Sequence, residues 1–199
     1  MTPPQVHDLI RIDAGIAAHW DAPAWVAAAL EHAPWVVVRR ACAAEGIPIG
    51  VRGARRAQRF AARIEPGDVR KRIVPGDLVA RSGADAGRLA HAARAVDAAA
   101  RSLRIRWGPA GAYGFELASG TCATHGASDL DIVIDGDSPR AALAEFAARC
   151  AQIERTTHVR IDAEVLFESA GIALRELVSG APAVLAKTPA GPLLVASPA

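Results

Sequence analysis

The first part of the chain alternates short apolar runs with turn-forming residues, a pattern typical of short strands. β-Branched residues dominate two of these runs, and Asp21 followed by Pro23 is a favourable helix start. Pro-Gly pairs at and just after residues 66–75 indicate loop and turn. We therefore predict strands over 9–12, 35–38 and 47–51, and a helix that ends near His32.

The second part of the chain predicts longer elements. Residues 85–103 are Ala-rich and carry apolar side chains at helical spacing, so we expect a helix there that connects two halves. Ser138 and Pro139 are typical of the start of another helix, which continues to about Cys150. Strands are expected over 113–118, 130–134, 159–167, 183–187 and 193–195, a loop over 119–127, and a short helix over 172–178. The predicted fold class is α+β, a mixed sheet flanked by helices, with domains over 1–84 and 85–199.

The composition is that of a folded chain, with 51% hydrophobic and 22% charged residues among 199. A formal net charge of +2 and an aromatic content of 5% argue against a nucleic-acid partner. The basic residues are nevertheless unevenly placed, and one cluster contains Arg52, Arg55, Arg56, Arg59 and Arg63. This cluster suits an acidic partner or a phosphorylated ligand, and a solvated basic surface explains it equally well.

Cysteine usage and hydropathy indicate the compartment. Cys42, Cys122 and Cys150 are widely spaced without a C-x-x-C pair, so neither a disulfide framework nor a zinc ribbon is indicated. Residues 1–13 lack the apolar core of a signal peptide, and no segment approaches the ~18 consecutive apolar residues of a membrane span. We expect a cytoplasmic protein with no membrane partner.

Two carboxylates mark the most informative segment. Asp129 and Asp131 are two residues apart on a predicted strand, so both side chains leave the same face. Adjacent carboxylates repel each other unless a cation neutralises them, and Mg²⁺ bound jointly with substrate phosphates suits such ligands. A second predicted strand carries Asp162, our first choice for a third ligand, with Glu164 next and Arg160 placed to balance phosphate charge.

A glycine-rich segment precedes the carboxylate pair, and Gly108 and Gly111 would let backbone N–H groups approach a phosphate. The segment is neither a Walker loop nor a dinucleotide fingerprint. A D-x-D pair alone is more often a solvated strand end. With the preceding glycines and the following carboxylate strand taken into account, a catalytic site and a solvated strand end are equally well supported.

The order of these motifs resembles the nucleotidyltransferase superfamily. In finer detail, Trp107-Gly108-Pro109-x-Gly111, the segment 114–120 and Ser128-Asp129-Leu130-Asp131 are similar to the phosphoribosyl-dephospho-CoA transferase family, also called malonate decarboxylase holo-acyl-carrier-protein synthase. In the first half, His7-Asp8-Leu9, the strand ending in Arg39-Arg40, and the segment 50–59 also resemble this family. The resemblance spans nearly the whole chain. It implies a nucleotidyltransferase-like second domain, preceded by a small α/β domain that binds carrier protein or substrate.

The resemblance also implies a reaction. Such enzymes transfer a phosphoribosyl-dephospho-CoA unit from 2′-(5-triphosphoribosyl)-3′-dephospho-CoA to a serine of the malonate decarboxylase acyl carrier protein and release pyrophosphate. Asp129, Asp131 and Asp162 would carry Mg²⁺ or another divalent cation, and Asp162 would act as ligand or general base. The phosphate-binding and substrate-binding residues implied are Gly108, Gly111, Ala112, Ser128, Arg160, Arg52 and Arg59.

The chain departs from the superfamily pattern at Ala112, where related sequences usually carry a serine whose hydroxyl supports a phosphate. Losing that hydrogen bond removes roughly 0.5–1.5 kcal/mol if the contact is neutral, and Thr121, Thr124 or Ser128 are candidates to replace it. Two alternatives stay open. One is a nucleotidyltransferase that acts on another small molecule or protein, and the other is a non-catalytic module that binds a carrier protein or CoA.

Overall fold

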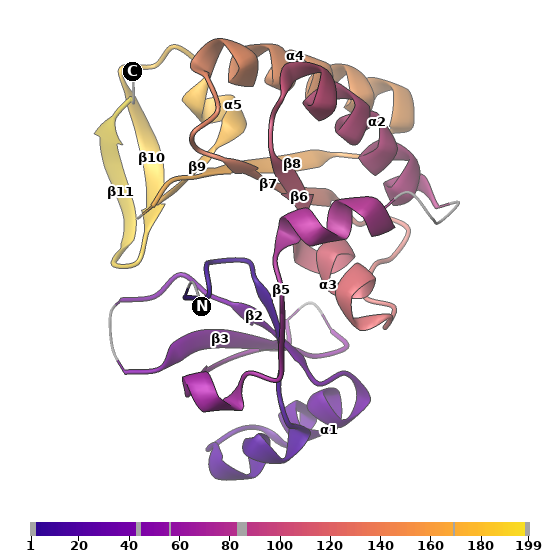
Figure 1. Ribbon diagram of the computed structural model, residues 1–199, viewed down its shortest axis with the longest axis vertical. Coiled ribbons are helices and arrows are strands. Elements are labelled where there is room, and N and C mark those ends of the chain that lie inside the picture. The colour runs from indigo at the N-terminus through magenta and orange to yellow at the C-terminus, as the bar shows by residue number, and fades with distance from the viewer. Residues whose placement is uncertain (1–2, 43–44, 56, 83–86, 169, 198–199) are drawn as a thin grey trace.

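The computed structural model describes residues 3–42, 45–55, 57–82, 87–168 and 170–197. Within these ranges the chain forms two sheets, each with its own helices, stacked one above the other in Figure 1. The predicted α+β class, with sheet flanked by helices, is confirmed. The boundary expected near residue 85, and Arg56 of the arginine cluster, lie outside the described residues.

The first sheet is antiparallel, and its described strands run in the order β4-β3-β2-β1-β5. These are β1 (Leu9–Arg11), β2 (Trp35–Val38), β3 (Ile47–Arg52), β4 (Arg59–Ile64) and β5 (Lys71–Ile73). Helix α1 (Ala24–His32) and 3-10 turns η1 (Ala14–His19), η2 (Pro66–Asp68) and η3 (Pro75–Arg81) complete this half. The core forms where Ile10, Val36 and Ile49 pack with Val26 and Leu30 of α1, all of them fully buried.

Two strands of the first sheet were not expected. β4 lies at the edge of the sheet, and Arg59 and Arg63 flank only a short apolar run, Phe60 to Ala62, in which the middle alanine is exposed. β5 lies inside the segment 66–75 that was predicted as loop, and it is only three residues long. Both strands owe their place to pairing with β3 and β1, which is a tertiary effect that local composition does not report.

The second sheet is mixed, with described strands in the order β11-β10-β9-β8-β7-β6. They are β6 (Trp107–Pro109), β7 (Leu130–Asp135), β8 (Ile161–Leu166), β9 (Gly171–Ala173), β10 (Ala183–Thr188) and β11 (Gly191–Ala196). β7 and β8 pair in parallel, joined by helix α4 (Arg140–Thr157), and the other neighbouring pairs are antiparallel. The strand that carries Asp131 therefore lies beside the strand that carries Asp162, as the choice of Asp162 for a third ligand requires.

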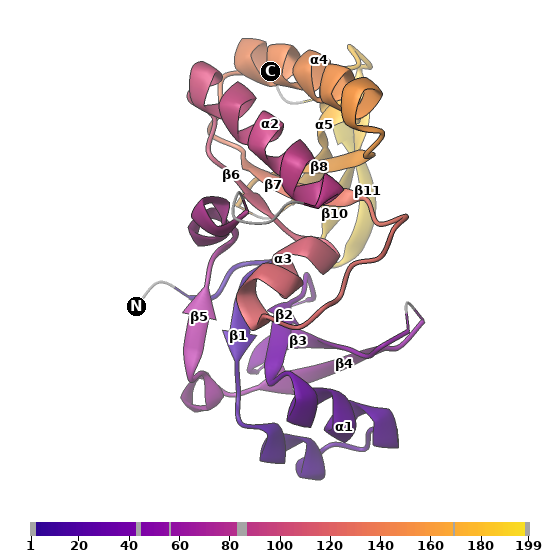
Figure 2. The same cartoon turned by 90° about the vertical axis from the view of Figure 1, so that its right-hand side faces the viewer.

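Helices cover both faces of the second sheet. Helix α2 (Arg88–Leu103), α4 and the short α5 (Leu174–Leu177) lie on the face away from the first sheet, and α3 (Gly111–Ser119) lies between the two sheets (Figures 1 and 2). Leu89, Val96, Phe146 and Ile132 belong to one continuous buried core on the α2 and α4 side. No helix among the described residues is long and apolar enough to cross a membrane.

Several predicted elements of the second half need correction. Residues 113–118, expected as a strand, form α3, and residues 107–109, expected within the glycine-rich segment, form β6. Tertiary packing decides this segment: a Cβ on Gly114 would lie 2.7 Å from the Pro109 carbonyl oxygen, so only glycine lets α3 approach β6 so closely. The segment 172–178 divides between β9 and α5.

The starts of the predicted helices also shift. Pro23 and Pro139 are themselves the N-cap residues of α1 and α4, and neither helix has a side-chain cap, so Asp21 and Ser138 do not cap them. The residue before a proline favours extended backbone, which delays each helix start. The helix expected to end near Cys150 continues to Thr157, where His158 adopts a left-handed conformation.

The two halves meet through a small apolar cluster and several polar contacts. Leu9 and Trp35 from the first sheet pack with Leu78 and with Phe115 of α3 in a third buried cluster. Arg52 Nη2 also donates to the Ala123 carbonyl oxygen at 2.8 Å, across the junction. This packing sets the relative position of the residues that the two halves contribute to a shared cavity.

Candidate active site

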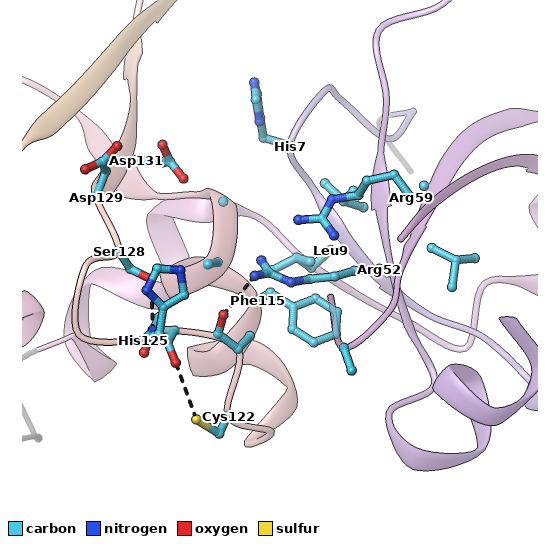
Figure 3. A pocket seen from close by; sticks show the side chains of 18 of the residues that line it. His7, Leu9, Arg52, Arg59, Phe115, Cys122, His125, Ser128, Asp129 and Asp131 are labelled. Atoms are coloured by element: carbon cyan, nitrogen blue, oxygen red, sulfur yellow. Dashed lines mark hydrogen bonds between the residues drawn. The ribbon is translucent and has the colours of Figure 1, made fainter. Parts of the chain in front are cut away.

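A cavity of about 710 Å³ lies between the first sheet and α3 with the loop that follows it (Figure 3). Its first-sheet side carries Arg39, Arg52 and Arg59, and Figure 3 shows the guanidinium groups of Arg52 and Arg59 pointing toward the second half. The opposite side carries the carboxylates Asp129 and Asp131. Residues more than 50 positions apart in the sequence therefore share one site, with cations facing carboxylates.

Asp131 lies at the start of β7, opposite Asp162 on the neighbouring parallel strand β8. Burial raises the pKa of Asp131, and the negative charges of Asp162 and Asp129 raise it further. His7 and the backbone N–H of Ala112 act in the opposite direction. Asp162 and Asp129 therefore lie close enough to Asp131 to disfavour its ionised form.

Gly111 allows the Asp131 side chain to reach the first turn of α3. Gly111 has a φ of 58°, in the left-handed region, and a Cβ at this position would lie 1.7 Å from Asp131 Oδ2. A side chain here would strain the backbone and collide with the carboxylate. Glycine at this position is therefore required by the carboxylate as well as by the helix start.

The chemistry of these side chains fits a hard divalent cation. Carboxylate oxygens are the ligands that Mg²⁺ takes alongside substrate phosphates, and a cation would relieve the repulsion that raises the pKa of Asp131. Within the part of the chain that the structure describes, no three acidic, histidine or cysteine side chains already converge on one metal-sized point. Asp129, Asp131 and Asp162 remain the predicted ligands, and a bound cation would draw them together.

The other predicted carboxylate-strand residues have different surroundings. Arg160 lies 3.4 Å from Asp129 Oδ2, and both groups are substantially exposed, so the pair contributes little to stability. Asp162 is exposed and does not line the cavity. Glu164, the second choice for a third ligand, instead accepts hydrogen bonds from Arg40 at 2.6 Å and Lys187 at 2.8 Å.

The loop between α3 and β7 forms one wall of the cavity, and Glu116 organises it. Its Oε2 atom accepts hydrogen bonds from the backbone N–H groups of Ala123 and Thr124 and from the Thr124 hydroxyl, each at 2.9 Å. Burial alone would raise the pKa of Glu116, but these hydrogen bonds and Arg52 hold it below its usual value. The loop is thus folded around one ionised carboxylate.

Of the remaining predicted phosphate-binding residues, some line the cavity and one packs inside the protein. Gly111, Ala112 and Ser128 line the cavity, whereas Gly108 does not, because it packs against Pro75, where a Cβ would lie 2.2 Å from the Pro75 carbonyl carbon. Of the three hydroxyls considered as substitutes for the missing serine at 112, Thr121 lies outside the cavity lining, and Thr124 donates to Glu116. The Ser128 hydroxyl accepts from the His125 N–H and keeps its own proton available.

Sequence reasoning missed three residues that the fold brings to this site. Arg39 follows a β-branched strand directly, His7 precedes β1, and Glu116 is an acid within an apolar segment. A polar residue beside an apolar run was the available signal in each case, together with the family resemblance of the segments that contain His7 and Arg39. Only the packing of the two halves shows that Arg39 and His7 line the same cavity as Asp131.

Comparison with known proteins gives consistent matches over both halves. The family model described as "Phosphoribosyl-dephospho-CoA transferase MdcG N-terminal domain" matches residues 5–75, and "Phosphoribosyl-dephospho-CoA transferase MdcG C-terminal domain" matches residues 77–198. The chain is 39% identical over 198 residues to a phosphoribosyl-dephospho-CoA transferase of Pseudomonas aeruginosa, covering 98% of this chain and 93% of that protein.

Two further relatives carry the same name. The chain is 35% identical over 199 residues to one from Pseudomonas putida, covering 100% of this chain and 96% of that protein. It is 35% identical over 209 residues to one from Azotobacter vinelandii, covering 98% and 94% respectively. No solved structure matches the chain.

Proposed function

This chain belongs to the phosphoribosyl-dephospho-CoA transferase family, and we propose that it attaches a phosphoribosyl-dephospho-CoA group to a carrier protein. The proposed donor is 2′-(5-triphosphoribosyl)-3′-dephospho-CoA. The proposed acceptor is a serine hydroxyl of the malonate decarboxylase acyl carrier protein, and pyrophosphate is the second product. The cytoplasm is the proposed location, supported by the free thiols of Cys42, Cys122 and Cys150.

The observation that carries this proposal is the two-sided cavity. Arg39, Arg52 and Arg59 face Asp129 and Asp131 across a space of about 710 Å³, within the size range of small-molecule sites. The donor is a polyanion, and arginines bind phosphate oxygens strongly because the guanidinium group presents a planar fork of donors. The first half therefore takes the substrate-binding part of its expected role, and its arginines draw the donor toward the carboxylates.

We propose that Asp129, Asp131 and Asp162 hold Mg²⁺ or another divalent cation. Such a cation supplies neutralising charge at the reacting phosphate and the pyrophosphate leaving group. The raised pKa of Asp131 supports this assignment, because buried, mutually repelling carboxylates are the groups that a cation stabilises most. Gly111 keeps the Asp131 carboxylate at the start of α3, where the Ala112 N–H orients it.

The proposed step is an in-line substitution at the α-phosphorus. A bond forms between the serine oxygen and phosphorus, the bond from phosphorus to pyrophosphate breaks, and the proton of the serine hydroxyl passes finally to water. Arg52 is fixed for this task by its hydrogen bond to Ala123 at 2.8 Å, on the loop that Glu116 organises. The Ser128 hydroxyl, on the same loop, is the proposed substitute for the serine that the family pattern places at 112.

Pyrophosphate release tests the proposal against its alternatives. The protein is incubated with Mg²⁺ and the triphosphoribosyl donor, with and without the apo carrier protein, and in parallel with ATP as donor. The proposal predicts pyrophosphate only with the triphosphoribosyl donor, and at a rate that depends on the carrier protein. Release from ATP would indicate a different nucleotidyltransferase, and tight carrier binding without release would favour a non-catalytic module.

A further inference from the structure

His7 lies just before β1 of the first sheet and has an unusual backbone conformation. Its backbone has a φ of 74°, in the left-handed region that residues other than glycine rarely adopt. The conformation is held from both sides, since the His7 N–H donates to Val38 O at 3.0 Å and the Val38 N–H donates to Asp8 O at 2.8 Å. Strain that the surroundings maintain in this way is concentrated at functional sites.

The two ring nitrogens of His7 have different environments. Nε2 is buried, has no hydrogen-bond partner among the described residues, and lies 4.0 Å from Glu164 Oε1. His7 and Asp131 both line the cavity (Figure 3), and among the described residues Nε2 but not Nδ1 of His7 is buried and unpaired, so Nδ1 is the nitrogen that remains accessible. The ring is therefore placed between a fixed carboxylate behind it and the cavity in front of it.

The Glu164 carboxylate near this ring is held in place by two cationic side chains. Arg40 Nη2 donates to its Oε1 atom at 2.6 Å and Lys187 Nζ to its Oε2 atom at 2.8 Å, which joins both halves of the molecule. Burial alone would raise the pKa of Glu164, but His7, Lys187 and Arg40 hold that pKa well below its usual range. A permanently ionised acceptor near Nε2 favours the tautomer with its proton on Nε2, and Nδ1 then carries a free lone pair.

A free lone pair in the cavity suits a hydroxyl donor better than a phosphate oxygen, which can only accept. Asp162, the residue first considered for activating the hydroxyl, does not line the cavity, whereas His7 does. We propose that His7 Nδ1 accepts a hydrogen bond from the attacking serine hydroxyl, which makes His7 a further catalytic residue and leaves Asp162 as a cation ligand. This inference rests on the proposed function.

In the substitution step, Nδ1 therefore faces the proton that the serine oxygen releases. As the oxygen–phosphorus bond forms and the bond to pyrophosphate breaks, the proton moves along the hydrogen bond to Nδ1 and then to water. Groups that act on a transferred proton in this way contribute roughly 100-fold or more to the rate. The contact concerns the acceptor, so the affinity for the donor does not depend on it.

Three substitutions separate this role from a structural one. His7→Asn places an amide oxygen at the Nδ1 position, His7→Gln places its amide near the Nε2 position, and His7→Gly removes the side chain while suiting the positive φ. Asparagine also tolerates the left-handed region, so the Asn and Gly variants keep the backbone. His91→Asn, an exposed histidine on α2, is the matched control.

The measurement is single-turnover transfer to the carrier protein, with donor KM and thermal unfolding recorded for every variant. We expect a loss of roughly 100-fold for Asn, whose amide oxygen can hold the hydroxyl but cannot take its proton, a loss greater by roughly 2–10-fold for Gly and Gln, and unchanged donor KM throughout. Equal losses in the Asn and Gly variants, or a raised donor KM, would overturn the assignment. Absence of transfer by the unsubstituted protein would instead contradict the proposed function, and this inference with it.

Discussion

Gly111→Ala adds one methyl group beside the Asp131 carboxylate and so tests the geometry of this site. Gly111 has a φ of 58°, and alanine in this region costs roughly 1–2 kcal/mol. For a chain of this length, each kcal/mol corresponds to a fall of roughly 2–4 °C in Tm, so strain alone predicts a fall of roughly 2–8 °C. The added methyl group also collides with Asp131, because its carbon would lie 1.7 Å from Oδ2.

The collision has a separate consequence for the reaction. Ordinary contact begins near 3.4 Å, so the carboxylate oxygen must retreat by 3.4 minus 1.7 Å, or about 1.7 Å. A displacement of about 1 Å at a reacting centre costs on the order of 100-fold in rate. We therefore expect Gly111→Ala to reduce transfer at least 100-fold, comparable to Asp131→Ala.

Gly120 supplies the matched control at the other end of the same helix. It has a φ of 72°, and a Cβ added there meets nothing within 4 Å. Gly120→Ala should therefore show a similar fall in Tm from strain, while its transfer rate stays within about twofold of the unsubstituted protein. Thermal unfolding and single-turnover transfer are measured on both variants. Equal transfer rates in the two variants would refute the claim that Gly111 positions the Asp131 carboxylate.

Three further predictions concern charged groups of the site. Burial, Asp162 and Asp129 raise the pKa of Asp131, so the ionised carboxylate destabilises the folded protein as the pH rises above the unfolded pKa of about 3.9. Asp131→Asn should therefore raise Tm at pH 7 in the presence of a chelator, and it should abolish transfer. A lower Tm would contradict this. His7, Lys187 and Arg40 outweigh burial and depress the pKa of Glu164. The ionised carboxylate therefore stabilises the folded protein fully above the unfolded pKa of about 4.3, and this stabilisation is lost as the pH falls below that value. Glu164→Gln should therefore lower Tm at pH 7 and flatten the fall in Tm between about pH 5 and 3, and an unchanged pH dependence would argue against this role. Glu116→Ala should release the 121–127 loop, increasing its proteolysis and raising donor KM through Arg52, whereas an unaltered cleavage pattern would show that the loop holds without it.

The fold was predictable where one local signal dominates. β7 and β8 were identified because β-branched residues alternate with carboxylates, and their parallel pairing follows from the intervening helix α4. α3 was mistaken for a strand, because its helical form depends on close packing of Gly114 against Pro109. β4 and β5 depend on partners elsewhere in the first sheet.

Some residues of the candidate site could likewise be predicted from a local pattern, and others could not. Asp129 and Asp131 were found from their spacing within one strand, and Arg52 and Arg59 from their clustering. Neither pattern shows that the two sets face each other across one cavity, because that follows from the packing of Phe115 against Leu9 and Trp35 at the junction. His7 and Arg39 belong to segments that resemble the family, but only the tertiary structure places them in the cavity.

The intact mass of the apo carrier protein reports the transferred group itself. The carrier protein of malonate decarboxylase is incubated with this protein, Mg²⁺ and 2′-(5-triphosphoribosyl)-3′-dephospho-CoA, and Asp129→Ala and Asp131→Ala are run alongside. We expect a mass gain of one phosphoribosyl-dephospho-CoA unit with the unsubstituted protein and none with either variant. No gain from folded protein with a donor that a related transferase accepts, or an equal gain with both variants, would contradict it.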